Sequence, residues 1–179
     1  MQLQLFSIIF SGLLYVGFYN LNTSLFQALE YSAGVSWIFL PAGMRLLCTL
    51  LFAEEGAVGL FLAAATIILM KYPEMDLVTG FGAATISAGA PFLVYRCALY
   101  WGMPSTLKQL TAYRLSILIL VYSAASACLH QTWFALRGLS SNPLQSFVAM
   151  FTGDLVGTLI VIYAMKMCLA AFGHLRKNA

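Results

Sequence analysis

Six apolar runs divide this chain, and they constrain its fold more than any other feature. They cover residues 3–19, 33–53, 56–70, 77–95, 113–136 and 144–165. A helix that crosses a bilayer needs about 20 apolar residues, within a range of about 17–25. Five of the runs meet that length, and the run at 56–70 needs a tilt or its flanking residues. Only 8% of the residues are charged, against about 25% in a soluble domain, so we expect the chain to fold in lipid.

The runs predict helices rather than a closed barrel. Helices and closed β-barrels are the two structures that satisfy every backbone polar group inside a bilayer. A barrel strand alternates apolar and polar residues, whereas stretches such as LFLAAATIILM at 60–70 do not alternate. We therefore predict an all-α, polytopic transmembrane bundle of about six spans, with residues 1–179 forming one integral membrane domain.

The basic residues predict the orientation of this bundle. With six spans, one side carries most of them in the 96–114 connection and in the tail: Arg96, Lys108, Arg114, Arg176 and Lys177. The connections on the other side carry Lys71 and Arg137. Lysine and arginine accumulate on the cytoplasmic side of membrane proteins. The pattern predicts that both termini are cytoplasmic, in a bacterial inner membrane.

The first connection, residues 20–32, contains a short helix-start pattern. Ser24 and Gln27 have the spacing of a capping box and are followed by apolar residues. A short interfacial helix and a plain loop are equally compatible with this pattern.

Two opposite charges lie within the apolar runs. Arg45 lies 12 residues after Ala33 and Asp154 lies 10 residues after Leu144. At 1.5 Å per residue, these are depths of about 18 Å and about 15 Å from the same side of a core about 30 Å thick. The two side chains therefore reach the middle of the bilayer, and we predict that they pair directly or through water.

Such a pair has two interpretations. Ionisable residues inside a membrane commonly face a water-filled cavity or bind a ligand, an ion or a proton. A buried pair can equally fix how two helices align, without any ligand. The residues alone leave these alternatives open.

The residues around the two charges are small or helix-breaking. Pro41 and Gly43 precede Arg45, and within a helix they predict a kink or break of the kind found at transporter and ligand sites. Gly153 and Gly157 flank Asp154 in a GxxxG pattern, which allows two helices to approach closely. We therefore predict a polar centre at Arg45 and Asp154, with the two glycines of the 144–165 run forming a packing surface.

The remaining chemically active residues predict neither an enzyme nor a metal site. His130 lies within the 113–136 run, and a single histidine is more typical of a hydrogen-bonded or proton-responsive group than of a metal ligand. We group it with the polar centre. The chain contains no HExxH, P-loop, GxSxG or dinucleotide motif. We expect no catalytic residue, no metal and no cofactor.

Two stretches resemble a known family. The segment VSWIFLPAGMRLLCTLLFAEEGAVG at 35–59 and the segment FTGDLVGTLIVIY at 151–163 resemble the membrane-associated sensor (MASE-type) domains of bacterial signalling proteins. The resemblance implies an integral sensor bundle that passes a signal to an attached or separate output protein. It draws attention to Pro41, Gly43, Arg45, Asp154 and the two flanking glycines. Those domains usually have more spans and a fused output domain, whereas here AFGHLRKNA follows the last run.

These observations predict a non-enzymatic membrane sensor or partner-docking protein with a buried Arg/Asp centre. Its expected partners are the lipid bilayer, another membrane protein and a small-molecule ligand. A small transporter subunit that binds a solute at the midplane is the first alternative, and a structural subunit of a larger membrane complex is the second. No stretch reads as a basic arm, so nucleic acid is not an expected partner.

Overall fold

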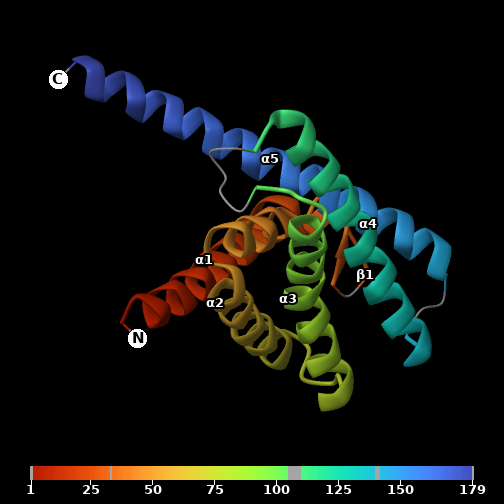
Figure 1. The fold of residues 1–179 in the computed structure, drawn as a ribbon. Helices are drawn as coiled ribbons and strands as arrows, with labels where there is room; N and C mark the ends of the chain where they lie inside the picture. Colours follow the sequence, from red (N-terminus) through yellow and green to blue (C-terminus); the bar gives the residue numbers. More distant parts are fainter. Residues whose placement is uncertain (1, 33, 105–109, 140–141, 179) are drawn as a thin grey trace.

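Five long helices build the structure (Figure 1). The computed structural model describes residues 2–32, 34–104, 110–139 and 142–178. The helices are α1 (Gln2–Phe26), α2 (Leu40–Lys71), α3 (Leu77–Tyr100), α4 (Ala112–Leu136) and α5 (Pro143–Asn178). A 3₁₀ turn, η1 (Gln27–Leu29), and an antiparallel pair of short strands, β1 (Glu30–Ser32) and β2 (Val35–Ser36), join α1 to α2.

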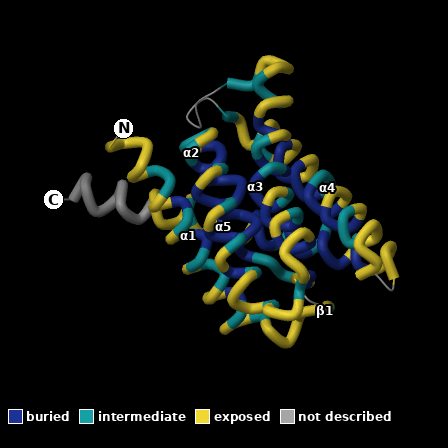
Figure 2. Tube along the Cα trace, turned by 90° about the horizontal axis from the view of Figure 1, so that it is seen from below, coloured by how far each residue is buried: buried dark blue, intermediate teal, exposed yellow. Residues whose placement is uncertain are grey.

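The prediction of a helical membrane bundle is confirmed at this level. Each of the five helices is long and apolar enough to cross a membrane. Large apolar side chains lie exposed on their outer faces, for example Leu3, Leu62 and Leu120, and Figure 2 shows exposed residues along the outside of the bundle. Polar side chains such as Thr49, Ser123 and Thr158 are fully buried. This distribution is expected for a protein whose surroundings are apolar.

Helix α2 folds back on itself, and it contains two of the predicted runs. Ala53 has non-helical backbone angles, φ 46° and ψ −116°. A straight helix of 32 residues would be about 48 Å long, yet both ends of α2 lie beside Tyr19. The Phe39 ring, just before α2, is 6.4 Å from the Tyr19 ring, and Lys71 Nζ is 5.3 Å from it. Helix α2 therefore consists of two arms that meet at Ala53. This position is next to the gap at residues 54–55 between the second and third predicted runs.

The structure corrects the boundaries of the first two predicted runs. Helix α1 continues through residues 20–26, where an interfacial helix or a loop was predicted. Ser24 is not a cap, because its hydroxyl donates to the carbonyl oxygen of Asn20 within that helix. The second run begins as a helix at Leu40 rather than near residue 33, and Ala33 lies outside the described residues. The other helices begin within one residue of their predicted starts.

The start of α2 is buried inside the bundle. Leu40 is 4% exposed, and its backbone N–H donates to Asn22 Oδ1 of α1 at 2.8 Å. The backbone N–H of Phe39 donates to the carbonyl oxygen of Gly153 in α5 at 3.1 Å. Buried backbone groups outside regular structure need such partners. Helices α1 and α5 together therefore hold the non-helical segment that leads into α2.

The contacts between helices define two ends of the bundle. At one end, Gln4 of α1 donates to Glu55, and Arg96 of α3 pairs with Glu54 at 3.3 Å. At the other end, the Tyr72 hydroxyl donates to Glu30. Figure 1 shows the start of α1 and the end of α5 on the same side of the molecule. The strands β1 and β2 mark the opposite end, which we call the strand end.

Asp76 at the strand end caps α3 and provides a pH-dependent contribution to stability. Hydrogen bonds from the Thr79 hydroxyl and backbone N–H, together with the guanidinium of Arg137 at 3.0 Å, lower the pKa of Asp76 from 3.8 to about 2. A group whose pKa is lower in the folded protein stabilises it above the unfolded pKa, and this stabilisation is lost as the pH falls through the folded pKa. The loss should therefore occur between about pH 4 and about pH 2.

We expect Asp76→Asn to lower the melting temperature in detergent at pH 7. Because the asparagine does not titrate, the difference from the wild type should shrink as the pH falls from about 4 to about 2. Thermal unfolding of both proteins across this range measures the effect. A difference that stays constant with pH would contradict the assigned hydrogen bonds.

Candidate functional site

The buried charges Arg45 and Asp154 are in contact, as predicted. Arg45 Nη2 lies 3.4 Å from Asp154 Oδ1, and each residue is 1% exposed. The guanidinium also lies over the ring of Phe39, 5.0 Å from its centroid. Arg45 lies in the second turn of α2, about 8 Å from the start of the helix. Arg45 is buried because the segment before Leu40 enters the bundle without forming a helix. The prediction that about 18 Å of continuous helix precedes Arg45 is therefore wrong.

This ion pair has few other partners. Among the described residues, Arg45 Nε and Asp154 Oδ2 are buried without a hydrogen bond. The same holds for the Tyr122 hydroxyl and for the side-chain oxygens of Ser126 and Thr158. Buried polar atoms are nearly always hydrogen-bonded to protein or to ordered water. The centre therefore has unused hydrogen-bonding capacity for water or for a ligand.

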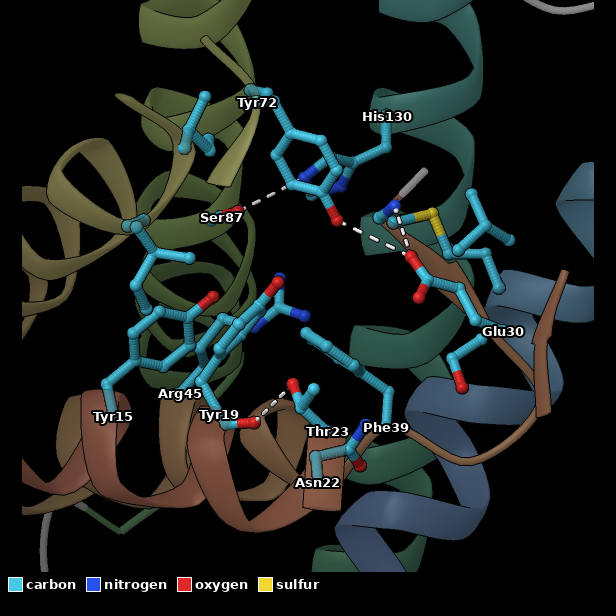
Figure 3. Close-up of a pocket in the computed structure, with 18 of the residues that line it drawn as sticks. Tyr15, Tyr19, Asn22, Thr23, Glu30, Phe39, Arg45, Tyr72, Ser87 and His130 are labelled. Atoms are coloured by element: carbon cyan, nitrogen blue, oxygen red, sulfur yellow. Dashed lines mark hydrogen bonds between the residues drawn. The ribbon is translucent and has the colours of Figure 1, made fainter. Parts of the chain in front are cut away.

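A cavity of about 90 Å³ leads from the strand end to Arg45 (Figure 3). Its lining includes the exposed residues Glu30 and Gly34 and the buried residues Arg45, Ser87 and His130. It therefore connects the surface with the buried side chain of Arg45. The remaining wall is largely aromatic and aliphatic, with contributions from Tyr15, Tyr19, Phe26, Phe39, Ile67, Ile68, Phe134 and Met150.

His130 forms part of the cavity floor through two hydrogen bonds. Its Nδ1 lies 2.9 Å from the carbonyl oxygen of Ser126, and its Nε2 lies 3.2 Å from Ser87 Oγ. A carbonyl oxygen only accepts, so Nδ1 carries a proton. In the neutral ring, Nε2 then accepts from the Ser87 hydroxyl. The ring is thereby fixed between α3 and α4.

A wider groove of about 580 Å³ adjoins the cavity at the strand end. Tyr72, Met75 and Phe134 line both spaces. The Tyr72 hydroxyl donates to Glu30 Oε1 at 3.4 Å where the two spaces meet. The groove also contains the carboxylates of Glu74 and Asp76. A solute that approaches from the strand end therefore meets acidic and aromatic side chains before it reaches Arg45.

The predicted site residues divide into two groups. Arg45 and His130 line the cavity, and Asp154 lies behind Arg45. Pro41 and Gly43 do not line the cavity. Pro41 lies in the first turn of α2, where its missing N–H removes no internal hydrogen bond. A kink or break within a helix was predicted at Pro41 and Gly43, whereas the helix begins at Leu40 and has no kink at Pro41.

The glycines of the site are packing residues. A Cβ at Gly43 would lie 2.6 Å from Val161 Cβ of α5. A Cβ at Gly153 would overlap the carbonyl oxygen of Ser36, and one at Gly157 would overlap that of Phe39. Gly153 and Gly157 therefore pack against the non-helical segment that leads into α2, whereas the GxxxG pattern was predicted to pack against a second helix.

Most of the cavity wall was not predicted from the sequence. Tyr15, Asn22 and Ser87 lie in or beside apolar runs on α1 and α3. Polar side chains within an apolar run were a usable signal, because each needs a partner in the interior. Which of them share one cavity depends on the helix packing. In the described part of the chain, no group of three or more His, Cys, Asp or Glu residues could hold a metal ion.

Comparisons with protein-family models, with curated proteins and with solved structures gave no match to this chain.

Proposed function

We propose that this chain is a non-enzymatic membrane sensor that binds a small solute in the cavity and acts through a partner protein. The observation that carries the proposal is the cavity, which runs from the exposed strand end to the guanidinium of a fully buried ion pair. A pair that only aligned two helices would need no access from the surface. The MASE-type resemblance around Pro41 and Asp154 supports the same function.

The proposal includes an orientation in a bacterial inner membrane. We propose six crossings, with the two arms of α2 counted separately and both termini cytoplasmic. Arg96 in the last turns of α3 and Arg114 in the first turn of α4 lie on either side of the connection between these helices, away from the strand end. Lys108 of the same connection lies outside the described residues. Because basic residues favour the cytoplasmic side, the cavity opens to the periplasm.

The packing beyond Arg45 is more typical of a receptor than of a channel. Beyond Arg45, Leu46, Leu50, Tyr95 and Leu118 pack in one apolar cluster with Tyr122. This cluster separates the cavity floor from the end that holds the termini. A transporter would have to open it. The fold of α2 at Ala53 and its buried start are the observations that favour transport, because broken helices recur in transporters.

A solute screen on the purified protein tests the binding proposal. Anionic, neutral and cationic small molecules are added in detergent, and the melting temperature is measured. A ligand at 100 times its dissociation constant stabilises by about 2.7 kcal/mol, so at least one solute should raise the melting temperature by several degrees. Ala83→Leu, which adds volume inside the cavity, should abolish the shift.

Two further variants control this screen. Gly89→Ala adds a methyl group where no atom lies within 4 Å and should keep the shift. Ala64→Leu fills the cavity from α2 and replaces Ala83→Leu if that protein does not fold. If no solute distinguishes the wild type from the filled variants, the binding proposal is wrong.

Purification from the native membrane separates the three classes of function. A sensor should retain a signalling polypeptide in a fixed ratio in mild detergent. A chain that is isolated alone and accumulates its solute in vesicles would be a transporter. A chain that is stable only within a larger complex, and that binds no solute, would be a structural subunit.

A further inference from the structure

We infer that the cavity ligand is a short-chain monocarboxylate whose carboxylate is bound by Arg45. This inference rests on the proposed binding function and specifies its ligand class. It depends on the unused donors of Arg45, on the position of the α2 N-terminus, on the charges around the cavity, and on the size and apolar wall of the cavity.

Arg45 supplies donors with the geometry that a carboxylate requires. A guanidinium has five N–H donors in a planar fork that matches a carboxylate. Among the described residues, its only hydrogen bond is the 3.4 Å contact with Asp154, and Nε has none. Figure 3 shows the nitrogen atoms of Arg45 among the residues that line the cavity. The fork is thus buried at the wall of the cavity, and most of its donors are unused.

The N-terminus of α2 adds a second positive element. Ser36, Phe39 and Arg45 all line the cavity, and they lie just before or within the first turns of α2. The N-terminus of a helix carries a partial positive charge of about half a unit, which favours a nearby anion. Asn22 already accepts the N–H of Leu40, so the helix contributes its dipole here and Arg45 contributes the hydrogen bonds.

The surrounding charges limit the ligand to one negative charge. Asp154 already offsets the charge of Arg45. Glu30 at the cavity opening and Glu74 in the adjoining groove are acidic, and Asp76 in that groove is paired with Arg137. A divalent phosphate or sulfate would place two further charges in this environment. A monovalent carboxylate adds one, which the helix dipole and the donors of Arg45 can accommodate.

The wall and the volume of the cavity specify the rest of the ligand. Phe39, Ile67 and Phe134 give the wall an apolar surface, which suits a hydrocarbon group better than an inorganic ion. A cavity of about 150 Å³ holds benzene, and this one measures about 90 Å³. The ligand should therefore be about the size of acetate, propionate or butyrate.

Thermal shifts with matched salts test this ligand class. Sodium propionate, acetate and butyrate are compared with sodium chloride at equal pH and ionic strength. Propionamide serves as the neutral molecule of the same shape. We expect propionate to raise the melting temperature in a saturable manner, whereas propionamide and chloride have no effect.

Two matched variants assign the effect to Arg45. Arg45→Lys keeps the charge beside Asp154 but loses the planar fork, so the apparent affinity for propionate should fall at least tenfold. Arg96→Lys makes the same change at an exposed arginine paired with Glu54 and should leave the affinity unchanged. If Arg45→Lys does not fold, the comparison of propionate with propionamide on the wild type decides the question.

The possible outcomes separate this inference from the proposed function. Equal shifts with nitrate, bicarbonate or phosphate would identify an inorganic anion site and overturn the carboxylate assignment. Equal shifts with propionamide would show that charge is not recognised, which also overturns it. Binding of only neutral or cationic solutes from the wider screen would refute the ligand class and leave the binding function standing. Absence of any specific solute would refute both.

Discussion

Asp154→Ala is expected to lower the free energy of unfolding by about 3–5 kcal/mol, because it leaves the buried guanidinium of Arg45 without a counter-charge. Arg45→Ala should have a similar effect through the carboxylate that remains. The double variant Arg45→Met/Asp154→Leu removes both charges and keeps apolar volume, so it should be more stable than either single variant. Reversible unfolding in mixed micelles measures all three.

The exposed pair of Arg96 and Glu54 is the control for this series. Its side chains are 60% and 68% exposed, so Glu54→Gln should change the free energy of unfolding by less than about 1 kcal/mol. Equal effects at the buried and exposed pairs would contradict the assigned burial. Additive effects of Arg45→Ala and Asp154→Ala in the variant that carries both alanines would show that Arg45 and Asp154 do not interact.

Gly157→Ala in α5 is expected to destabilise the protein by at least about 1–3 kcal/mol, the range for overpacking a close contact. The added Cβ would overlap the backbone carbonyl of Phe39, and backbone atoms cannot rotate away as a flexible side chain can. Gly153→Ala should act in the same way through the carbonyl of Ser36. Both substitutions push α5 away from the segment that positions Arg45.

Gly17→Ala in α1 is the matched control for the two glycine substitutions. A Cβ at this position meets no atom within 4 Å, and alanine is favoured over glycine in a helix interior by about 1 kcal/mol. The melting temperature should therefore stay unchanged or rise. If Gly157→Ala were as stable as Gly17→Ala, the close approach of α5 to the segment before α2 would be refuted.

The apolar runs predicted the membrane bundle because apolar length is a local property of the sequence. The contact between Arg45 and Asp154 was also predictable, because a charge inside lipid has few stable alternatives to an opposite charge at the same depth. The start of α2 was not predictable from hydropathy. The residues 34–39 are apolar enough to extend a helix, and it is the contacts from Asn22 and Gly153 that hold this segment outside one.

The cavity could not be predicted for a related reason. Tyr15, Ser87 and His130 lie on three different helices, and each alone is compatible with ordinary interior packing. They line one space only because α2 folds back at Ala53 and brings α1 and α3 to either side of Arg45. The gap between the runs at residues 54–55 predicted a turn there, but it did not predict which helices this turn would bring beside Arg45.

The pairing of Arg45 with Asp154 has a consequence for the synthesis of the chain. The two residues are 109 positions apart, and ribosomes add about 5–20 residues per second. Arg45 is therefore made about 5–20 s before its counter-charge exists. During that interval the nascent α2 holds an unpaired cation. The segment before α2 also lacks the backbone carbonyl of Gly153, which accepts the N–H of Phe39 in the folded protein. The last helix therefore completes the interior of a bundle whose first helices have already been synthesised.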